Sequence, residues 1–305
     1  MKPTSLILAA TLLMTTTPSL AGAAGRTDLP PAPDAARKPH VVKAPHGAQR
    51  VDEYYWLRDD KRKNPEVLAY LNAENAYVDA LMAPLKPLEN ALYDEIVGRI
   101  KQDDSSVPYR ERGWWYYARF VAGKDYPVHA RRKDGPGVDA VSIQKANEAG
   151  DFAGEQVLLD VNALGEGKDY YSVGDYEVSQ DNRLLAYADD TNGRRQYTIR
   201  FKNLDTGEML PDTVTNAEPN LVWSNDGRTL FYVDKDPETL LSKRVKAHVL
   251  GTPASQDALV YEEEDDSFYM GIGRTRDDKF ICISVESTVS SEMRCTPAAS
   301  PGVFT

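Results

Sequence analysis

The chain has 305 residues, a length that favours two domains. Its 41% hydrophobic and 27% charged residues are ordinary for a globular protein, which excludes wholesale disorder and a collagen-like fold. The formal net charge of -11 repels phosphate backbones and argues against nucleic acid as a partner. Two cysteines exclude a disulfide scaffold, and no Cys/His spacing resembles a zinc site, so we expect no metal and no cofactor.

Residues 1–23 are predicted to be a signal peptide. Lys2 supplies a positive charge, and the apolar run Leu6–Met14 is much shorter than the ~20 residues of a membrane-spanning helix. The small residues before position 24 fit a cleavage site near Ala23, which would release a periplasmic or secreted protein without membrane contact. Cleavage after Ala21 and an uncleaved membrane anchor are the alternatives.

Residues 24–40 are rich in Pro, Ala and charge, and we predict a flexible lead-in there. Residues 41–104 are predicted to be a helical segment. The pair Asn64-Pro65 is a helix start signal, and Pro84 and Pro87 end this first helix before a second one begins. Each helix carries an apolar stripe that needs a partner surface: Val67, Leu68, Leu71, Val78, Leu81 and Met82, then Leu88, Leu92, Ile96, Val97 and Ile100.

Residues 105–295 are predicted to be all-β, because short Tyr- and Val-rich runs alternate with Gly, Asn, Asp and Pro turns. An internal repeat refines this prediction: residues 179–187 (SQDNRLLAY) match residues 224–232 (SNDGRTLFY), and a weaker copy covers residues 276–283. The repeated aspartates Asp181, Asp226 and Asp277 are 45 and 51 residues apart. A turn-then-strand repeat of this length is typical of β-propeller blades, and the region has room for about four of them. Chance similarity among β-hairpins is the alternative.

The chain lacks the common catalytic signatures. It contains no Gly-x-Ser-x-Gly, no His-Glu-x-x-His and no phosphate-binding glycine loop. Its four histidines, His40, His46, His129 and His248, are isolated in the sequence, so we predict no catalytic residue. The acidic run at residues 262–266 is expected to be a solvated loop, with attraction of basic peptides as the alternative.

Residues 46–60, HGAQRVDEYYWLRDD, closely resemble the N-terminal region of the prolyl oligopeptidase family of serine peptidases, and its oligopeptidase B branch in particular. The similarity covers about residues 38–294 and includes RIKQDDSSVPY at 99–109, LLDVN at 158–162, GRRQY at 193–197 and YEE at 261–263. The resemblance implies a seven-bladed propeller over an α/β-hydrolase domain on which the N-terminal helices pack. It also implies cleavage of short peptides after Lys or Arg by a Ser-His-Asp triad, with the propeller excluding folded proteins.

The family's catalytic residues belong to a C-terminal half that this sequence does not contain, so none is carried over. The similarity is expected to stop at residue 294, and residues 296–305 are predicted to be an aberrant tail, as a frameshift or premature end would produce. We therefore expect a mostly β chain: a helical segment followed by a partial propeller of about four blades, without the α/β-hydrolase domain.

Arg194 and Arg195 are the site residues that the resemblance suggests, as interdomain contacts. Family members use arginine in the propeller for ion pairs with the hydrolase domain. Bracing of a blade loop is the alternative, and a solvated surface pair of this kind would contribute about 0–1 kcal/mol.

Three functions are compatible with these observations. We favour an inactive, truncated form of an exported peptidase over a stand-alone peptide-binding propeller or one half of a split peptidase. The expected partners are short peptides containing Lys or Arg and a missing or separate hydrolase domain. The unpartnered helical stripes and the open edge of the last blade also predict low stability.

The two cysteines are Cys282 and Cys295. If Ser287–Ser290 form a hairpin loop, the cysteines lie opposite each other at a spacing that permits a cross-strand disulfide in an oxidising compartment. We expect two free thiols because Cys295 begins the tail, and the disulfide is the alternative.

Overall fold

The computed structural model describes residues 30–305, so the predicted signal peptide lies outside the described residues. The structure divides into two compact units, one ending at Ile100 and the other comprising Lys101–Thr305, whereas the sequence places the boundary after residue 104. None of the helices in the described part is long and apolar enough to cross a membrane.

The first unit contains a β-hairpin and two helices. Its elements are β1 (His40–Lys43), β2 (Gln49–Asp52), a 3-10 turn (Tyr55–Leu57), α1 (Pro65–Met82), a second 3-10 turn (Ala83–Leu85) and α2 (Lys86–Gly98). As predicted, α1 begins at Pro65, and the side chain of Asn64 caps it by accepting the backbone N–H of Glu66 at 3.0 Å. The hairpin was not predicted: it lies inside the segment expected to be helical, and its turn contains Gly47 at φ 86°.

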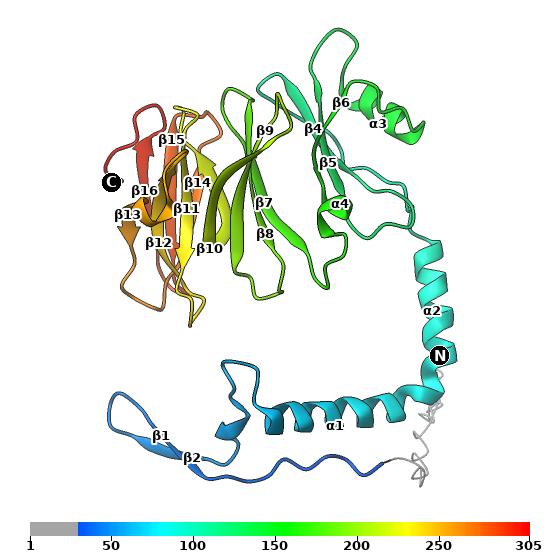
Figure 1. Ribbon diagram of the computed structural model, residues 1–305, viewed down its shortest axis with the longest axis vertical. Helices are drawn as coiled ribbons and strands as arrows, with labels where there is room; N and C mark the ends of the chain where they lie inside the picture. Colours follow the sequence, from blue (N-terminus) through cyan, green and yellow to red (C-terminus); the bar gives the residue numbers. More distant parts are fainter. Residues whose placement is uncertain (1–29) are drawn as a thin grey trace, which may run out of the picture. The chain divides into compact units, whose positions relative to one another are not determined.

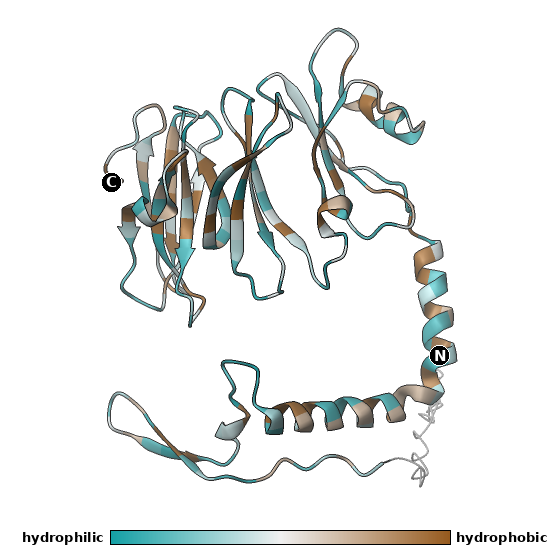
Figure 2. Ribbon diagram, in the orientation of Figure 1, coloured by the Kyte–Doolittle hydropathy of each residue, from teal (hydrophilic) through white to brown (hydrophobic). Residues whose placement is uncertain are grey.

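The apolar stripes of α1 and α2 are exposed. Val67 is buried, but the side chains of Leu71, Val78, Leu92 and Ile96 are each about half exposed. Figure 2 shows hydrophobic and hydrophilic residues side by side along both helices. Within the described residues the predicted need for a partner surface is therefore unmet.

The second unit is built mainly of antiparallel strands (Figure 1). Its strands are β3 (Tyr109–Glu111), β4 (Trp114–Arg119), β5 (Val128–Lys133), β6 (Glu155–Asp160), β7 (Ser172–Val178), β8 (Leu184–Asp190), β9 (Tyr197–Asn203), β10 (Met209–Trp223), β11 (Thr229–Lys235), β12 (Ser242–Val249), β13 (Ala258–Glu262), β14 (Tyr269–Arg274), β15 (Phe280–Glu286) and β16 (Ser291–Pro297). Its helices are α3 (Ala140–Glu148) and α4 (Val161–Gly165), with a 3-10 turn at Ala254–Gln256.

These strands form four propeller blades in chain order, as predicted. The first blade is β3–β6 and the fourth is β14–β16. The second and third blades share the long strand β10, which pairs with β9 up to Ala217 and with β11 from Ala217 onward. Figure 1 shows the blades side by side, from the first in green to the last in orange and red.

The predicted repeat is the turn between the first and second strands of a blade. In three blades an aspartate side chain accepts a backbone N–H two residues ahead, and the residue between them has a left-handed backbone. The aspartates and left-handed residues are Asp181 with Asn182 (φ 66°), Asp226 with Gly227 (φ 63°) and Asp277 with Asp278 (φ 59°). The repeat is therefore a true blade signature and not a chance similarity among hairpins.

The core lies between neighbouring blades. Leu158, Leu185 and Tyr187 are buried between the first and second blades, Phe201 and Trp223 belong to a cluster between the second and third, and a further cluster joins the third to the fourth. The stabilisation comes from burial of apolar surface along these seams, at about 25 cal/mol per Å² of apolar area.

Two helices, α3 and α4, depart from the all-β prediction. α3 lies between β5 and β6, and Asp139 and Ser142 close a capping box at its start. Ile143 buries the inner side of α3 against Tyr117 and Ala130 of the first blade. The capping pattern Asp139-x-x-Ser142 is a signal for a helix start, but the period-two pattern of the surrounding strands obscured it.

The predicted aberrant tail is part of the fourth blade, which corrects the sequence prediction. β16 runs to Pro297, Thr305 exchanges both backbone hydrogen bonds with Cys295, and Phe304 is buried against Phe231. The Pro/Ala/Ser composition of this segment concealed the few apolar residues that anchor it.

The two cysteines form a disulfide, so the expectation of free thiols is wrong. The hairpin register was predicted correctly: Ser287 and Ser290 close the loop, and Cys282 pairs directly with Cys295. Their Cα atoms are 4.0 Å apart. The expectation of free thiols was wrong because it treated Cys295 as the start of an aberrant tail, whereas Cys295 lies within strand β16.

The acidic run at residues 262–266 begins at the last residue of β13 and continues as a mostly exposed loop, as expected. Lys243 holds it by donating to the carbonyl oxygen of Glu263 and the carboxylate of Asp266.

Candidate functional site

Charged side chains gather where the first strands of the blades enter their turns. Glu111 ends β3, Glu177 lies in β7 and Arg274 ends β14, whereas Arg112 and Asp278 lie in the following turns. β10 contacts both β7 and β14, so these strands lie where the blades converge. We call the five residues the inner charge cluster.

The cluster joins the first and fourth blades through Asp278. The Nε atoms of Arg112 and Arg274 are each 3.7 Å from a carboxylate oxygen of Asp278. Arg112 also donates to Glu111 at 2.5 Å and to the carbonyl oxygen of Val178 at 3.2 Å. These side chains line a cavity of about 220 Å³.

Glu177 is the least compensated member of the inner charge cluster. No hydrogen bond or ion pair reaches its carboxylate from the rest of residues 30–305. Burial raises its pKa to about 8, and the neighbouring carboxylates of Asp175 and Glu111 act in the same direction, whereas Arg112 and Arg274 oppose them. A partly buried carboxyl group with a raised pKa that lines a cavity is a candidate binding group.

Replacement of Glu177 by glutamine should reduce the decrease in the free energy of unfolding that occurs as the pH rises. The pKa of Glu177 is about 8 in the folded state, above its unfolded value, so the folded state retains a proton that the unfolded state has lost. Stability therefore falls as pH rises from about 4.5 to about 8 and then levels off. Over that window, wild type should lose about 1–3 kcal/mol more than Glu177→Gln in urea unfolding. Glu166→Gln, at an exposed glutamate, is the matched control, and parallel profiles for all three proteins would contradict the assignment.

The predicted pair Arg194 and Arg195 lies in the loop between β8 and β9, at the other end of the strands from the inner charge cluster. The loop is braced through its backbone: the N–H of Arg195 donates to Asp190 at 2.8 Å, and its carbonyl oxygen accepts Lys235 Nζ at 2.9 Å. In the described part of the chain, neither guanidinium has a hydrogen bond or ion pair, and Arg194 Nε is buried without a partner. An ion pair with a further domain remains a prediction for both.

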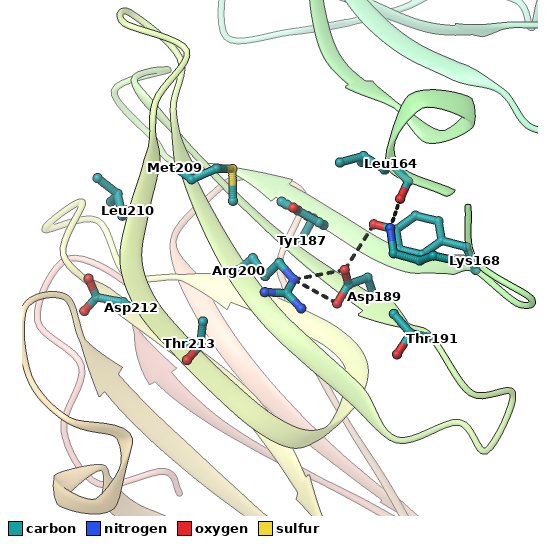
Figure 3. Close-up of a pocket in the computed structure, with 11 residues that line it drawn as sticks. Leu164, Lys168, Tyr187, Asp189, Thr191, Arg200, Met209, Leu210, Asp212 and Thr213 are labelled. Atoms are coloured by element: carbon teal, nitrogen blue, oxygen red, sulfur yellow. Dashed lines mark hydrogen bonds and ion pairs between the residues drawn. The ribbon is translucent and has the colours of Figure 1, made fainter. Parts of the chain in front are cut away.

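A second cavity, of about 300 Å³, lies beside strands β8, β9 and β10 (Figure 3). On its floor Arg200 Nε donates to both oxygens of Asp189, at 3.1 and 2.9 Å, and the Tyr171 hydroxyl donates to the same carboxylate at 3.1 Å. These groups satisfy one another, so the arrangement joins strands and contains no nucleophile beside a base.

His248 is fully buried, with its ring nitrogens 2.8 Å from Asp257 and 3.3 Å from Asp212. The Tyr232 hydroxyl donates to the second oxygen of Asp257 at 2.8 Å. No serine hydroxyl contacts a histidine within residues 30–305, so this network has no nucleophile and its role is structural. The same residues contain no cluster of His, Cys, Asp and Glu arranged to hold a metal ion.

A comparison with protein families matches residues 33–305 to the N-terminal beta-propeller domain of prolyl oligopeptidase. The chain belongs to the prolyl oligopeptidase family. This family assignment and the four blades confirm the resemblance seen in the sequence. The match extends to residue 305, so the family pattern continues through the predicted tail. The frameshift hypothesis rested on an end of the similarity at residue 294, and this match removes that support.

The chain is similar to bacterial peptidases and to a peptidase of known structure. It is 88% identical to dipeptidyl aminopeptidase BI of Pseudoxanthomonas mexicana, over all of this chain and 42% of that protein. It is 35% identical to protease 2 of Moraxella lacunata, over 88% of this chain and 37% of the relative. Oligopeptidase B from Leishmania major superposes with a TM-score of 0.79 at 32% identity, over 89% of this chain and 38% of that structure. The chain thus spans about two fifths of the length of the peptidases it matches.

Sequence reasoning missed the inner charge cluster, although the repeat contains a signal for it. The turn residues Ser179, Ser224 and Thr275 are equivalent, and Val178, Trp223 and Arg274 precede them. The charged residue Arg274 stands where the second and third blades have the apolar residues Val178 and Trp223, which indicates an inner position outside the apolar core.

Proposed function

We propose that this chain is the propeller portion of an exported serine peptidase that acts on short peptides containing Lys or Arg. The observation that carries the proposal is the family match over residues 33–305, together with the similarity to an oligopeptidase B structure. The inner charge cluster supports the choice of basic peptides, because Glu177 supplies a partly buried carboxyl group, without an ion-pair partner within residues 30–305, in the cavity that the cluster lines.

A second candidate is removal of dipeptides from free N-termini. It is favoured by the name of the 88% identical relative, a dipeptidyl aminopeptidase. The two candidates differ in one chemical requirement, because a dipeptidyl aminopeptidase needs the free α-amino group whereas an endopeptidase does not.

The chain by itself should not hydrolyse peptides. Peptide hydrolysis in this chemistry needs an activated serine and an oxyanion hole, and the described residues contain no serine beside a histidine. The purified chain should give no turnover of a fluorogenic arginyl substrate above buffer. Turnover that a serine-directed inhibitor abolishes would refute this expectation.

The peptidase proposal is tested by joining this chain to the remaining part of the Pseudoxanthomonas mexicana relative, whose propeller is 88% identical. The fusion should cleave arginyl peptides and leave the glutamyl analogues intact. Equal cleavage of N-acetylated and free peptides supports the endopeptidase, and cleavage of the free peptide alone supports the dipeptidyl aminopeptidase. Equal turnover of arginyl and glutamyl peptides would exclude the proposed specificity.

Export is tested separately by expressing the full chain in a Gram-negative host and determining the N-terminus of the recovered protein. A periplasmic product that begins at Ala24 supports the proposed signal peptide. A product that retains Met1 in the cytoplasm contradicts it.

A further inference from the structure

A cavity in the second unit lies between the first and second blades. It has a volume of about 580 Å³, and we call it the seam pocket. Trp114, Arg131 and Lys133 line it from β4 and β5, and Asp181, Asn182 and Arg183 line it from the turn between β7 and β8. The inner charge cluster borders it through Arg112.

Arg131 is a buried cation without a carboxylate partner in the described part of the chain. Its side chain is 1% exposed, and its guanidinium lies over the Trp114 ring at 3.9 Å from the centroid. It donates to Gln156 Oε1 at 2.8 Å, to the Tyr116 hydroxyl at 3.1 Å and to the carbonyl oxygen of Asn182 at 2.8 Å. All these acceptors are neutral, whereas buried charges in proteins are normally paired with an opposite charge.

The carboxylates of the pocket are already engaged. Asp205 accepts Arg183 Nε at 2.7 Å, and Asp181 accepts the Ser179 hydroxyl at 2.6 Å and the backbone N–H of Arg183 at 3.1 Å. Lys133 is exposed, and no ion pair of its ammonium group occurs within residues 30–305. The seam pocket therefore presents excess positive charge in a chain whose net charge is -11.

We propose that the seam pocket binds a small oxyanion, a phosphate or carboxylate group. Guanidinium and ammonium groups are the protein donors best suited to such ions, and a buried cation strengthens the attraction because little water screens it. The pocket opens beside two exposed cations, Lys133 and Arg183, which contact the ion directly, while Arg131 and Trp114 form its floor. This site differs in charge from the cavity that the inner charge cluster lines, so basic peptides would be repelled here.

The test is calorimetric titration of the full chain with inorganic phosphate and, separately, with citrate, at constant ionic strength set by chloride. The double variant Lys133→Gln/Arg183→Gln removes the two exposed cations and leaves the buried floor intact. Lys61→Gln/Lys124→Gln is the matched control, with the same change in net charge at exposed lysines outside the pocket.

Saturable binding that the double variant weakens at least tenfold, and the control pair leaves within twofold, supports the site. Binding of phosphate alone identifies the phosphate group as the ligand, and binding of citrate alone identifies the carboxylate. Absence of saturable binding of both ions overturns the proposal, as does an equal loss in the double variant and the control pair. The variant Trp114→Phe provides a second readout, since binding should quench tryptophan fluorescence in wild type and less in the variant.

Discussion

Replacement of Trp223 by alanine is expected to lower the free energy of unfolding of the propeller unit by about 3–5 kcal/mol. The Trp223 side chain is 1% exposed in the cluster between the second and third blades, with Phe201 edge-on at 5.8 Å. Its ring N–H donates to the carbonyl oxygen of Glu177 at 3.0 Å. Alanine therefore leaves a cavity in a close-packed seam and a buried carbonyl group without its donor.

Urea unfolding followed by circular dichroism measures this loss as a fall in midpoint at unchanged slope. Phe280→Ala is the matched control, because Phe280 is an aromatic residue of the same unit with 42% of its surface exposed, and it should cost under about 1 kcal/mol. Trp223→Phe should fall between the two, since it refills most of the volume but lacks the donor. Equal losses in the free energy of unfolding for Trp223→Ala and Phe280→Ala would show that packing of Trp223 between the second and third blades does not contribute the expected stability.

Reduction of the disulfide between Cys282 and Cys295 is expected to cost about 3 kcal/mol, because the bond closes a loop in the unfolded chain and restricts its conformations. The two cysteines are 13 residues apart in the sequence and pair directly between β15 and β16. Their bond also anchors the strand to which Thr305 adds, so the effect should concentrate in the fourth blade.

Urea unfolding of the oxidised and the dithiothreitol-reduced protein measures this cost without any change of side chain. The double variant Cys282→Ala/Cys295→Ala should be insensitive to the reductant, which controls for its other effects. Mass spectrometry of alkylated, non-reduced protein should detect no modified cysteine. Two alkylated cysteines would exclude the bond, and identical midpoints would exclude its role in stability.

Local signals in the sequence predicted local structure well. The Asn64-Pro65 pair predicted the start of α1 because capping depends on a side chain and a backbone only two residues apart. The aspartates of the repeat predicted the blade turns for the same reason, since each binds a backbone N–H two residues ahead.

Predictions were wrong where the local sequence pattern was weak and packing against other segments or a stronger neighbouring signal mattered more. The segment 296–305 has few apolar residues, yet Ala298 and Phe304 are buried because strand β15 and Phe231 offer them a surface. The hairpin β1–β2 was overlooked because its strands have four residues each, too few to establish a period-two pattern beside strong helical signals.

The blade repeat, the start and the apolar stripes of the helices, the register of the cysteine hairpin and the peptidase family could all be predicted from the amino-acid sequence. Each of these follows from contacts between near neighbours or from a pattern repeated along the chain. The bond between the cysteines, the partial burial of Glu177 and the lack of a carboxylate partner for Arg131 within residues 30–305 became visible in the folded arrangement alone. These properties depend on residues that are up to dozens of positions apart in the sequence and come together only in the fold. The electrostatic energy of a charged group depends on its distance from water and from other charges, which the order of residues does not give.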